Sequence, residues 1–262
     1  MNERIEKLVN KTVSGEMYVY PVKTEYDRCD LFLPPVKMSA KRVCEYIRNQ
    51  EPLIVPESCF TGLIKFDNSV EGDIFGRPGH ANFGKACNNF YNQPVDNLLT
   101  FEWQHSAGDF GKIITGGITG VKDEIQKSIQ NHKEDENALR FLETQLDICD
   151  AIIDWAKKCS KKALIVSEST KNTEYKKNLE RLSQALEHVP QNPAKNFYEA
   201  ILSLYICYGF IPDSIGLIDR YLYPFYKKDI ENGVLTKEEA SGYLQELFLM
   251  LQARIHISSD RF

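Results

Sequence analysis

The sequence predicts a mainly α-helical protein with a few strands. From about Asp96 almost to its end, the chain carries apolar residues at helical spacing, interrupted by helix-starting signals. From Glu51 to Pro94 the composition changes to β-forming apolar residues and glycines, as in PLIVPESCFTGLIKF and EGDIFGRPGHANFG. This is the one stretch for which we expect strands or long loops. With 262 residues, 42% of them hydrophobic, the chain is large enough to bury a core.

The N-terminal region starts with a short helix candidate and then becomes irregular. Pro21, Pro34 and Pro35 each disfavour helix at the residue before them. The next predicted helix runs from Ser39 to Arg48, with Ser39 as its N-cap.

Downstream, four patterns predict helices. NPAKNFYEAILSLYICYGF opens with Asn192 as cap and Pro193 in the first turn, and LTKEEASGYLQELFLML opens with a capping box of Thr236 and Glu239. The Lys- and Glu-rich run 157–177 predicts a solvated helix face with a turn in it. A long helix is predicted by an apolar stripe at three- and four-residue spacing, which we interpret as core: Leu139, Leu142, Leu146, Cys149, Ile153 and Ala156.

Composition excludes several classes of protein. A net charge of -5 and a pI near 5.7 argue against a nucleic-acid partner, because such proteins cluster Lys and Arg against phosphates. No apolar run approaches the length of a membrane span, and the N-terminus carries no signal region, so we expect a cytoplasmic protein without a membrane partner. The seven cysteines form no CxxC pair, which predicts reduced thiols and no metal site.

Two constellations could carry chemistry. In HSAGDFGKIITGGITGVKDEI, His105 and Asp109 lie four residues apart, so a carboxylate could orient an imidazole, and the glycines allow backbone to approach a neighbour closely. The simpler interpretation is that Asp109 only favours the positive end of a helix. In SIGLIDRYLYPFYKKDIENG, Ser214 could cap a helix or line a site, and the tyrosines could be framework.

The order of these motifs resembles that of a known enzyme family. The run from NPAKNFYEAILSLYICYGF through SIGLIDRYLYPFY to LTKEEASGYLQELFLML is similar to the pattern NFxEAL, a serine, GRxDQYxYPYY, then LT and EA. Upstream, HSAGDFGKIITGGITGV resembles HxxxDYxxxLxxGxxGI. On these motifs, residues 103–251 resemble the glycyl radical enzymes of the pyruvate formate-lyase-like superfamily. The resemblance is closer to the diol-dehydratase and lyase branches of that superfamily than to pyruvate formate-lyase itself.

The resemblance implies that residues 1–262 are the N-terminal part of a ten-stranded α/β barrel of the pyruvate formate-lyase type. In such enzymes a separate S-adenosylmethionine and iron–sulfur activating enzyme installs a glycyl radical, which passes to a cysteine whose thiyl takes a substrate hydrogen atom. The cysteine loop GCxE and the glycine loop RVxGY do not occur in these 262 residues. We therefore expect a fragment with no catalytic residue and no bound cofactor of its own, inactive alone.

The aligned motifs also imply site residues and partners. His105, Asp109 and Ser214 match substrate-binding positions, and Gly216, Asp219 and Tyr223 match the framework beside them. The implied partners are a small-molecule substrate and the activating enzyme in an anaerobic cytoplasm, and the family allows a homodimer.

Two positions depart from the family pattern and leave the reaction open. Leu217 stands where the family has arginine, and Arg220 stands where it has glutamine. We expect a lyase or dehydratase acting on a small polar metabolite. The alternatives are a formate acetyltransferase-type acyl transfer and a non-catalytic helical binding or scaffold protein derived from the fold.

Overall fold

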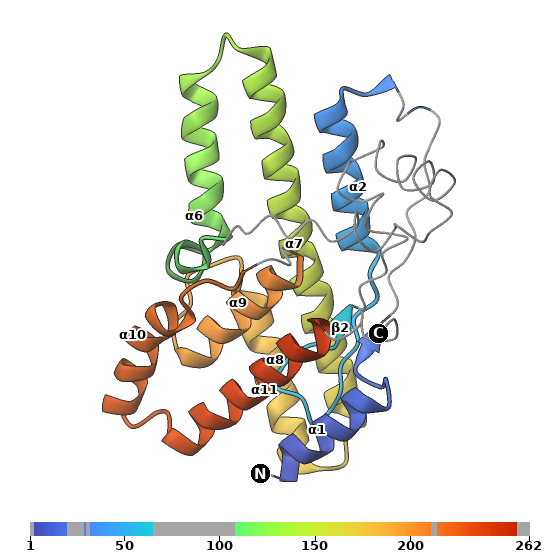
Figure 1. Ribbon diagram of the computed structural model, residues 1–262, viewed down its shortest axis with the longest axis vertical. Helices are drawn as coiled ribbons and strands as arrows, with labels where there is room; N and C mark the ends of the chain where they lie inside the picture. Colours follow the sequence, from blue (N-terminus) through green and yellow to red (C-terminus); the bar gives the residue numbers. More distant parts are fainter. Residues whose placement is uncertain (1–2, 20–28, 30–31, 65–107, 211–213, 256–262) are drawn as a thin grey trace, which may run out of the picture.

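The chain folds into a packed group of helices, as predicted (Figure 1). The computed structural model describes residues 3–19, 29, 32–64, 108–210 and 214–255. Two strands of two residues each pair in parallel, β1 (Tyr18–Val19) with β2 (Leu63–Ile64). The rest of the predicted strand region, 65–94, lies outside the described residues. The helices are α1 (Glu3–Val13), α2 (Pro35–Asn49), α6 (Phe110–Asn131), α7 (Glu136–Ser169), α8 (Thr173–His188), α9 (Phe197–Phe210), α10 (Ile218–Glu231) and α11 (Lys237–Ile255).

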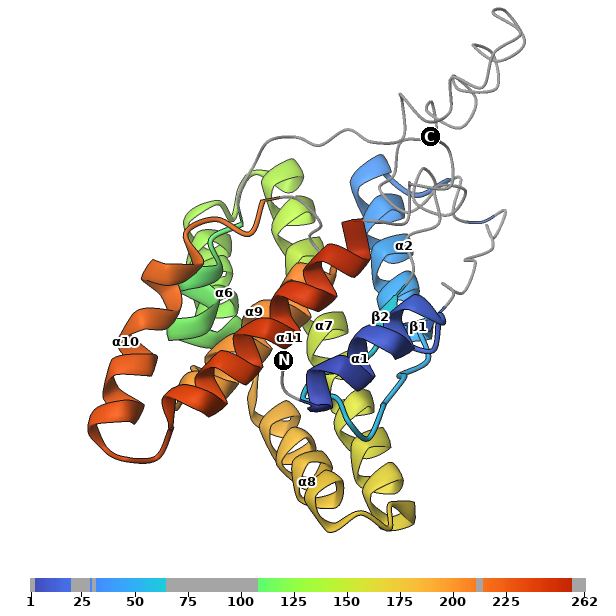
Figure 2. The same ribbon diagram turned by 60° about the horizontal axis from the view of Figure 1, so that its bottom comes forward.

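Helix α9 is the centre of the fold. Every residue from 197 to 208 is buried, which is the burial expected for a helix that is apolar on all sides. It contacts α6, α8, α10 and α11, and Figure 2 shows α11 lying across it. These four helices are therefore positioned by their packing on one central hydrophobic helix.

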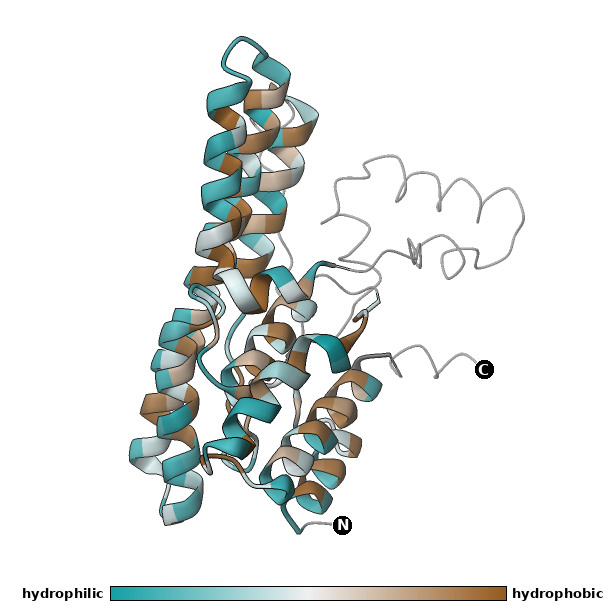
Figure 3. Ribbon diagram, turned by 90° about the vertical axis from the view of Figure 1, so that its left-hand side faces the viewer, coloured by the Kyte–Doolittle hydropathy of each residue, from teal (hydrophilic) through white to brown (hydrophobic). Residues whose placement is uncertain are grey.

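Helices α6 and α7 form a hairpin that projects from this centre, with polar residues at its tip (Figure 3). Helix α2 packs along α7. The predicted stripe on α7 is confirmed, since Ile153 and Ala156 are buried and the four residues before them are half-buried. The predicted turn in the Lys- and Glu-rich run is also confirmed, because α7 ends at Ser169 and α8 begins at Thr173.

Helix starts were predicted correctly where the cap is local in sequence. At α11 the backbone N–H of Glu239 donates to Thr236 Oγ1 over 3.1 Å, and the backbone N–H of Thr236 donates to Glu239 Oε2 over 2.8 Å. The predicted capping box therefore exists. The Glu239 pKa is lowered, because its carboxylate accepts from the backbone and the hydroxyl of Thr236.

Two other predicted caps are wrong. Helix α2 begins at Pro35 rather than Ser39, because proline at the first position is already set for helix and its missing N–H needs no acceptor. Helix α9 begins at Phe197, and Asn196 rather than Asn192 accepts from the Glu199 N–H at 2.9 Å. The buried carboxylate of Asp229, on α10, accepts from the Phe197 N–H at 2.7 Å, a cap supplied by tertiary structure.

Gly117 breaks α6 where the loop before α9 crosses it. Its φ of 68° lies in the left-handed region, and an added Cβ would lie 2.5 Å from Gln191 O. The break releases two N–H groups, and the loop satisfies them: Ile118 N donates to Pro190 O and Thr119 N to Gln191 O. The prediction that the glycines of this segment allow a close backbone approach is confirmed at Gly117.

A buried carboxylate joins segments from both ends of the chain. The Glu246 side chain, on α11, is fully buried and pairs with Arg4 of α1. It also accepts from Ser58 Oγ at 2.6 Å and from the Cys59 N–H at 2.8 Å. The loop holding these residues is further tied to α9, because Tyr198 Oη donates to Cys59 O at 2.6 Å. Several hydrogen bonds satisfy the charge, as burial requires.

Replacing Gly117 tests the kink. Gly117→Ala should lower the free energy of unfolding by about 3 kcal/mol, since it adds backbone strain and a clash with a carbonyl oxygen. The matched variant is Gly120→Ala, where an added Cβ meets nothing within 4 Å, and it should stabilise the helix by about 0.5–1 kcal/mol. Urea unfolding followed by circular dichroism measures both. Equal midpoints for the two variants would contradict the kink assignment.

Replacing Glu246 tests the buried carboxylate. Glu246→Gln should lower the free energy of unfolding by about 3 kcal/mol, because it removes the fully buried negative charge that pairs with Arg4. The control Asp154→Asn breaks an exposed pair with Arg48 and should cost less than about 1 kcal/mol. The same urea titration measures the unfolding midpoints of both variants. A Glu246→Gln midpoint as high as that of the control would contradict a stabilising role for the Glu246 carboxylate.

Candidate functional site

The two constellations meet where α6 begins and the turn 214–217 leads into α10. Helices α6 and α10 contact each other, and both contact α9. We call the start of α6 the Asp109 arm and the turn 214–217 the Ser214 arm. The ring of Tyr221 lies between these two arms, against Gly111 on one side and Gly216 on the other. We therefore define the candidate site as the start of α6, the turn 214–217 and Tyr221.

Asp109 caps the first of these arms. Its Oδ1 accepts from the Lys112 N–H at 3.0 Å, and the side chain is exposed at the helix start. This geometry agrees with the simpler interpretation of Asp109 as a helix-end residue, and it leaves Oδ2 without a hydrogen bond among the described residues. His105 lies outside the described residues, so its predicted pairing with Asp109 stays a prediction.

Ser214 and Gly216 shape the second arm. The exposed Ser214 Oγ accepts from the Gly216 N–H at 3.2 Å, which folds the serine back over its own turn. Gly216 has a φ of 70°, a conformation that favours glycine. Ser214 does not cap α10, because Leu217 occupies the N-cap position without a side-chain hydrogen bond. Ser214 therefore faces solvent beside an uncapped helix start.

The framework residues of α10 differ in what they contact. Asp219 is exposed in the first turn, and Tyr223 is 60% exposed, with its ring centre 6.5 Å from that of Tyr226. Tyr221 is the tyrosine that joins the two arms, and sequence reasoning grouped it with the other tyrosines as framework. The signal that could have found it is the pair of glycines, one on each arm, that its ring requires.

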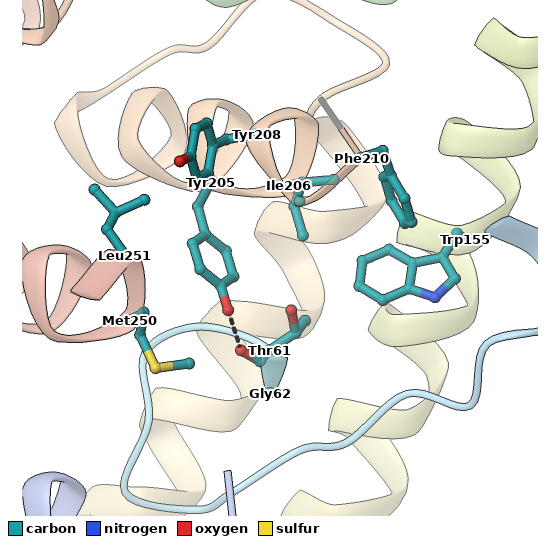
Figure 4. A pocket seen from close by; sticks show the side chains of 10 residues that line it. Thr61, Gly62, Trp155, Tyr205, Ile206, Tyr208, Phe210, Met250 and Leu251 are labelled. Atoms are coloured by element: carbon teal, nitrogen blue, oxygen red, sulfur yellow. Dashed lines mark hydrogen bonds between the residues drawn. The ribbon is translucent and has the colours of Figure 1, made fainter. Parts of the chain in front are cut away.

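A small apolar cavity lies behind the first arm, and sequence reasoning missed it. Thr61 lines it together with Trp155, Tyr205 and Met250 (Figure 4). Tyr205 Oη donates to Thr61 O at 2.7 Å, whereas Thr61 Oγ1 and Trp155 Nε1 are buried without a hydrogen-bond partner among the described residues. Tyr208, also in the lining, packs on Phe110 at 6.2 Å between ring centres. The cavity and the start of α6 therefore share one aromatic wall.

Five of the described cysteines are not activated nucleophiles. Burial raises the pKa of the Cys44 and Cys149 thiols to about 11, and that of Cys207 to about 12. Burial, with the nearby Glu246 carboxylate, raises the Cys59 pKa to about 12. Burial also raises the pKa of the Cys159 thiol. These thiols therefore stay protonated at neutral pH.

In the part of the chain that the structure describes, no group of three His, Cys, Asp or Glu side chains could hold a metal ion. No helix among the described segments is long and apolar enough to cross a membrane. The candidate site presents the Ser214 hydroxyl, the Asp109 carboxylate and the Tyr221 ring.

This chain is similar in sequence to several curated enzymes. Isethionate sulfite-lyase of Bilophila wadsworthia is 33% identical over 159 residues, which cover 56% of this chain and 19% of that protein. Trans-4-hydroxy-L-proline dehydratase of Clostridioides difficile is 26% identical over 188 residues, covering 59% of this chain and 23% of that protein. The chain thus spans about a fifth of the length of these curated relatives.

Solved structures show the same fold. The B12-independent glycerol dehydratase of Clostridium butyricum matches with a TM-score of 0.76 at 18% identity, over 97% of this chain and 40% of that one. The structure describing 1,2-propanediol dehydration in Roseburia inulinivorans matches with a TM-score of 0.75 at 20% identity, over the same shares. A family model described as "Pyruvate formate lyase-like" matches residues 97–262. The predicted resemblance is confirmed, and this chain belongs to the pyruvate formate lyase-like family, among the relatives of glycyl radical lyases and dehydratases.

Proposed function

We propose that this chain forms one wall of the substrate site of a glycyl radical lyase or dehydratase that acts on a small polar metabolite. The observation that carries the proposal is the meeting of the two motif-bearing arms, Asp109 and Ser214, on either side of Tyr221. The relatives are lyases, dehydratases and decarboxylases, which supports the reaction class. In this proposal the chain supplies the mainly helical N-terminal part of a ten-stranded α/β barrel.

The chain's own groups would bind and orient a hydroxylated substrate. Ser214 Oγ uses a lone pair to accept from Gly216 N, so its proton can be donated to a substrate oxygen. Asp109 uses Oδ1 for its cap, so Oδ2 can accept from a substrate hydroxyl or orient His105. The glycyl radical, installed by the separate activating enzyme, would supply hydrogen-atom abstraction through a cysteine in a GCxE loop, a motif that these 262 residues do not contain.

Leu217 limits what this wall recognises. The residue is 52% exposed at the position where the family pattern has arginine. An alkyl side chain cannot make the paired hydrogen bonds of a guanidinium with a carboxylate. We therefore propose that the substrate presents a hydroxyl rather than an anionic group next to Ser214. The proposed setting is the anaerobic cytoplasm, with the activating enzyme as a partner and a homodimer as the assembly.

Substitution of Ser214 tests the proposed function. In the polypeptide that carries these residues together with the cysteine and glycine loops, anaerobic activation should give a doublet in electron spin resonance. Ser214→Ala should keep that doublet and lower kcat/KM about 10- to 100-fold, the loss of one substrate hydrogen bond. The control Ser241→Ala, on the exposed face of α11, should change neither.

The two readouts separate two failures. No radical after verified activation would refute the glycyl radical assignment itself. A normal radical with unchanged kcat/KM in Ser214→Ala would instead remove Ser214 from the site and leave the reaction class standing.

Thiol labelling tests whether five of the described cysteines are held as protonated thiols in the folded chain. At pH 9 an ordinary thiol is about half ionised, whereas thiols of pKa about 11 or 12 are at most about 1% ionised. Iodoacetamide should therefore leave these residues unlabelled in the folded chain and label them in guanidinium: Cys44, Cys59, Cys149, Cys159 and Cys207. The exposed Cys29 serves as the positive control. Rapid native labelling of any of these five, read by mass spectrometry, would contradict their raised pKa values.

A further inference from the structure

We infer that Tyr221 is a positioning residue whose ring fixes the separation between the Asp109 arm and the Ser214 arm. The purpose that we give to this separation, the placement of substrate-binding groups, rests on the proposed function. The spacing itself is a property of the folded chain and can be measured without turnover.

On the α6 side, the ring edge lies directly against backbone. A Cβ added at Gly111 would be 2.9 Å from Tyr221 Cδ1 and 3.1 Å from Cε1. It would also lie 3.6 Å from Asp109 Oδ1, so Gly111 neighbours both the ring and the candidate carboxylate. Because no side chain fits between, the distance from α6 to α10 is set by the ring and not by a compressible contact.

On the other side, the hydroxyl end of the same ring meets the turn. A Cβ added at Gly216 would lie 2.7 Å from Tyr221 Oη and 3.4 Å from Cε2. Gly216 already needs its positive φ to form the turn that folds Ser214 back. The space for the hydroxyl and the conformation of the turn therefore both demand glycine, and one tyrosine spans the gap between the arms.

Both ends of this spacer are anchored in the core. Phe110, next to Gly111 in α6, is fully buried against Tyr208 of α9. Leu222, next to Tyr221 in α10, is 3% exposed. The ring itself is half-buried, and its hydroxyl has no hydrogen bond among the described residues. A ring held this way serves geometry rather than a polar contact within the chain.

Hydrogen exchange measured by mass spectrometry tests the spacer in the full 262-residue chain. Tyr221→Ala should raise amide exchange at least about tenfold in both 108–116 and 214–222, because each arm loses its neighbour, while α7 and α8 stay protected. The matched control is Tyr223→Ala, which removes an exposed tyrosine from the same helix and should leave 108–116 unchanged. Unchanged exchange in 108–116, or an equal rise across the whole chain, would overturn the inference.

A rescue experiment keeps the inference testable if Tyr221→Ala fails to fold. Gly216→Ala should push the ring toward α6 and so raise exchange in 108–116, on the arm that does not carry the substitution. Adding Tyr221→Phe removes the hydroxyl that meets the new methyl group. The contact is then relieved, because the nearest remaining ring atoms lie at 3.4 Å or more from that methyl group. The double variant should return 108–116 to within about twofold of the parent. Persistent exchange there in the double variant would overturn the spacer role.

Turnover separates this inference from the proposed function. In the activated enzyme, Gly216→Ala should lower kcat/KM with the radical signal intact, and Tyr221→Phe should restore kcat/KM in part, because alanine at a positive φ still strains the turn. An active enzyme that is indifferent to Gly216→Ala overturns the positioning role. A polypeptide that never forms the radical overturns the proposed function, while the exchange results still decide whether Tyr221 sets the spacing.

Discussion

The buried carboxylate of Glu246 is the interaction on which the contact between the ends of the chain depends. A charge with no exposed surface must be satisfied completely, and here Arg4, Ser58 and the Cys59 backbone do so from segments about 190 or more residues distant in sequence. Arg181 extends the network by stacking on Tyr198 and Tyr243, 4.5 and 5.2 Å from the ring centres. Helix α1, the loop 57–61, α8 and α11 are thereby fixed around α9.

The candidate site follows from this arrangement rather than from any one motif. Helix α9 is buried on all sides, so α6 and α10 are held against it and against each other. Their facing surfaces leave a gap that one tyrosine ring fills between two glycines. A site built from short polar side chains on such arms needs a fixed spacing, because a hydrogen bond weakens steeply once donor and acceptor move apart.

Local signals in the sequence predicted the fold well where the interaction is local. The α7 stripe and the Thr236–Glu239 capping box depend on residues within a few positions of each other, and both are present. The caps proposed at Ser39 and Asn192 failed because a proline pair and the carboxylate of Asp229 decide those helix starts. The candidate residues Asp109 and Ser214 were selected by motif, whereas Tyr221 was not, because the role proposed for Tyr221 depends on a contact 110 positions away along the chain.

The sequence by itself determined the helical class and the family, because periodicity and motif order are properties of the chain. Only the tertiary structure decided which glycines matter. Gly111 and Gly216 are needed because the Tyr221 ring occupies the space of a side chain, and Gly117 is needed because the loop before α9 crosses α6 there, whereas an added Cβ at Gly116 or Gly120 meets nothing. The physical reason is that steric exclusion acts between segments distant in sequence, and packing alone brings them together.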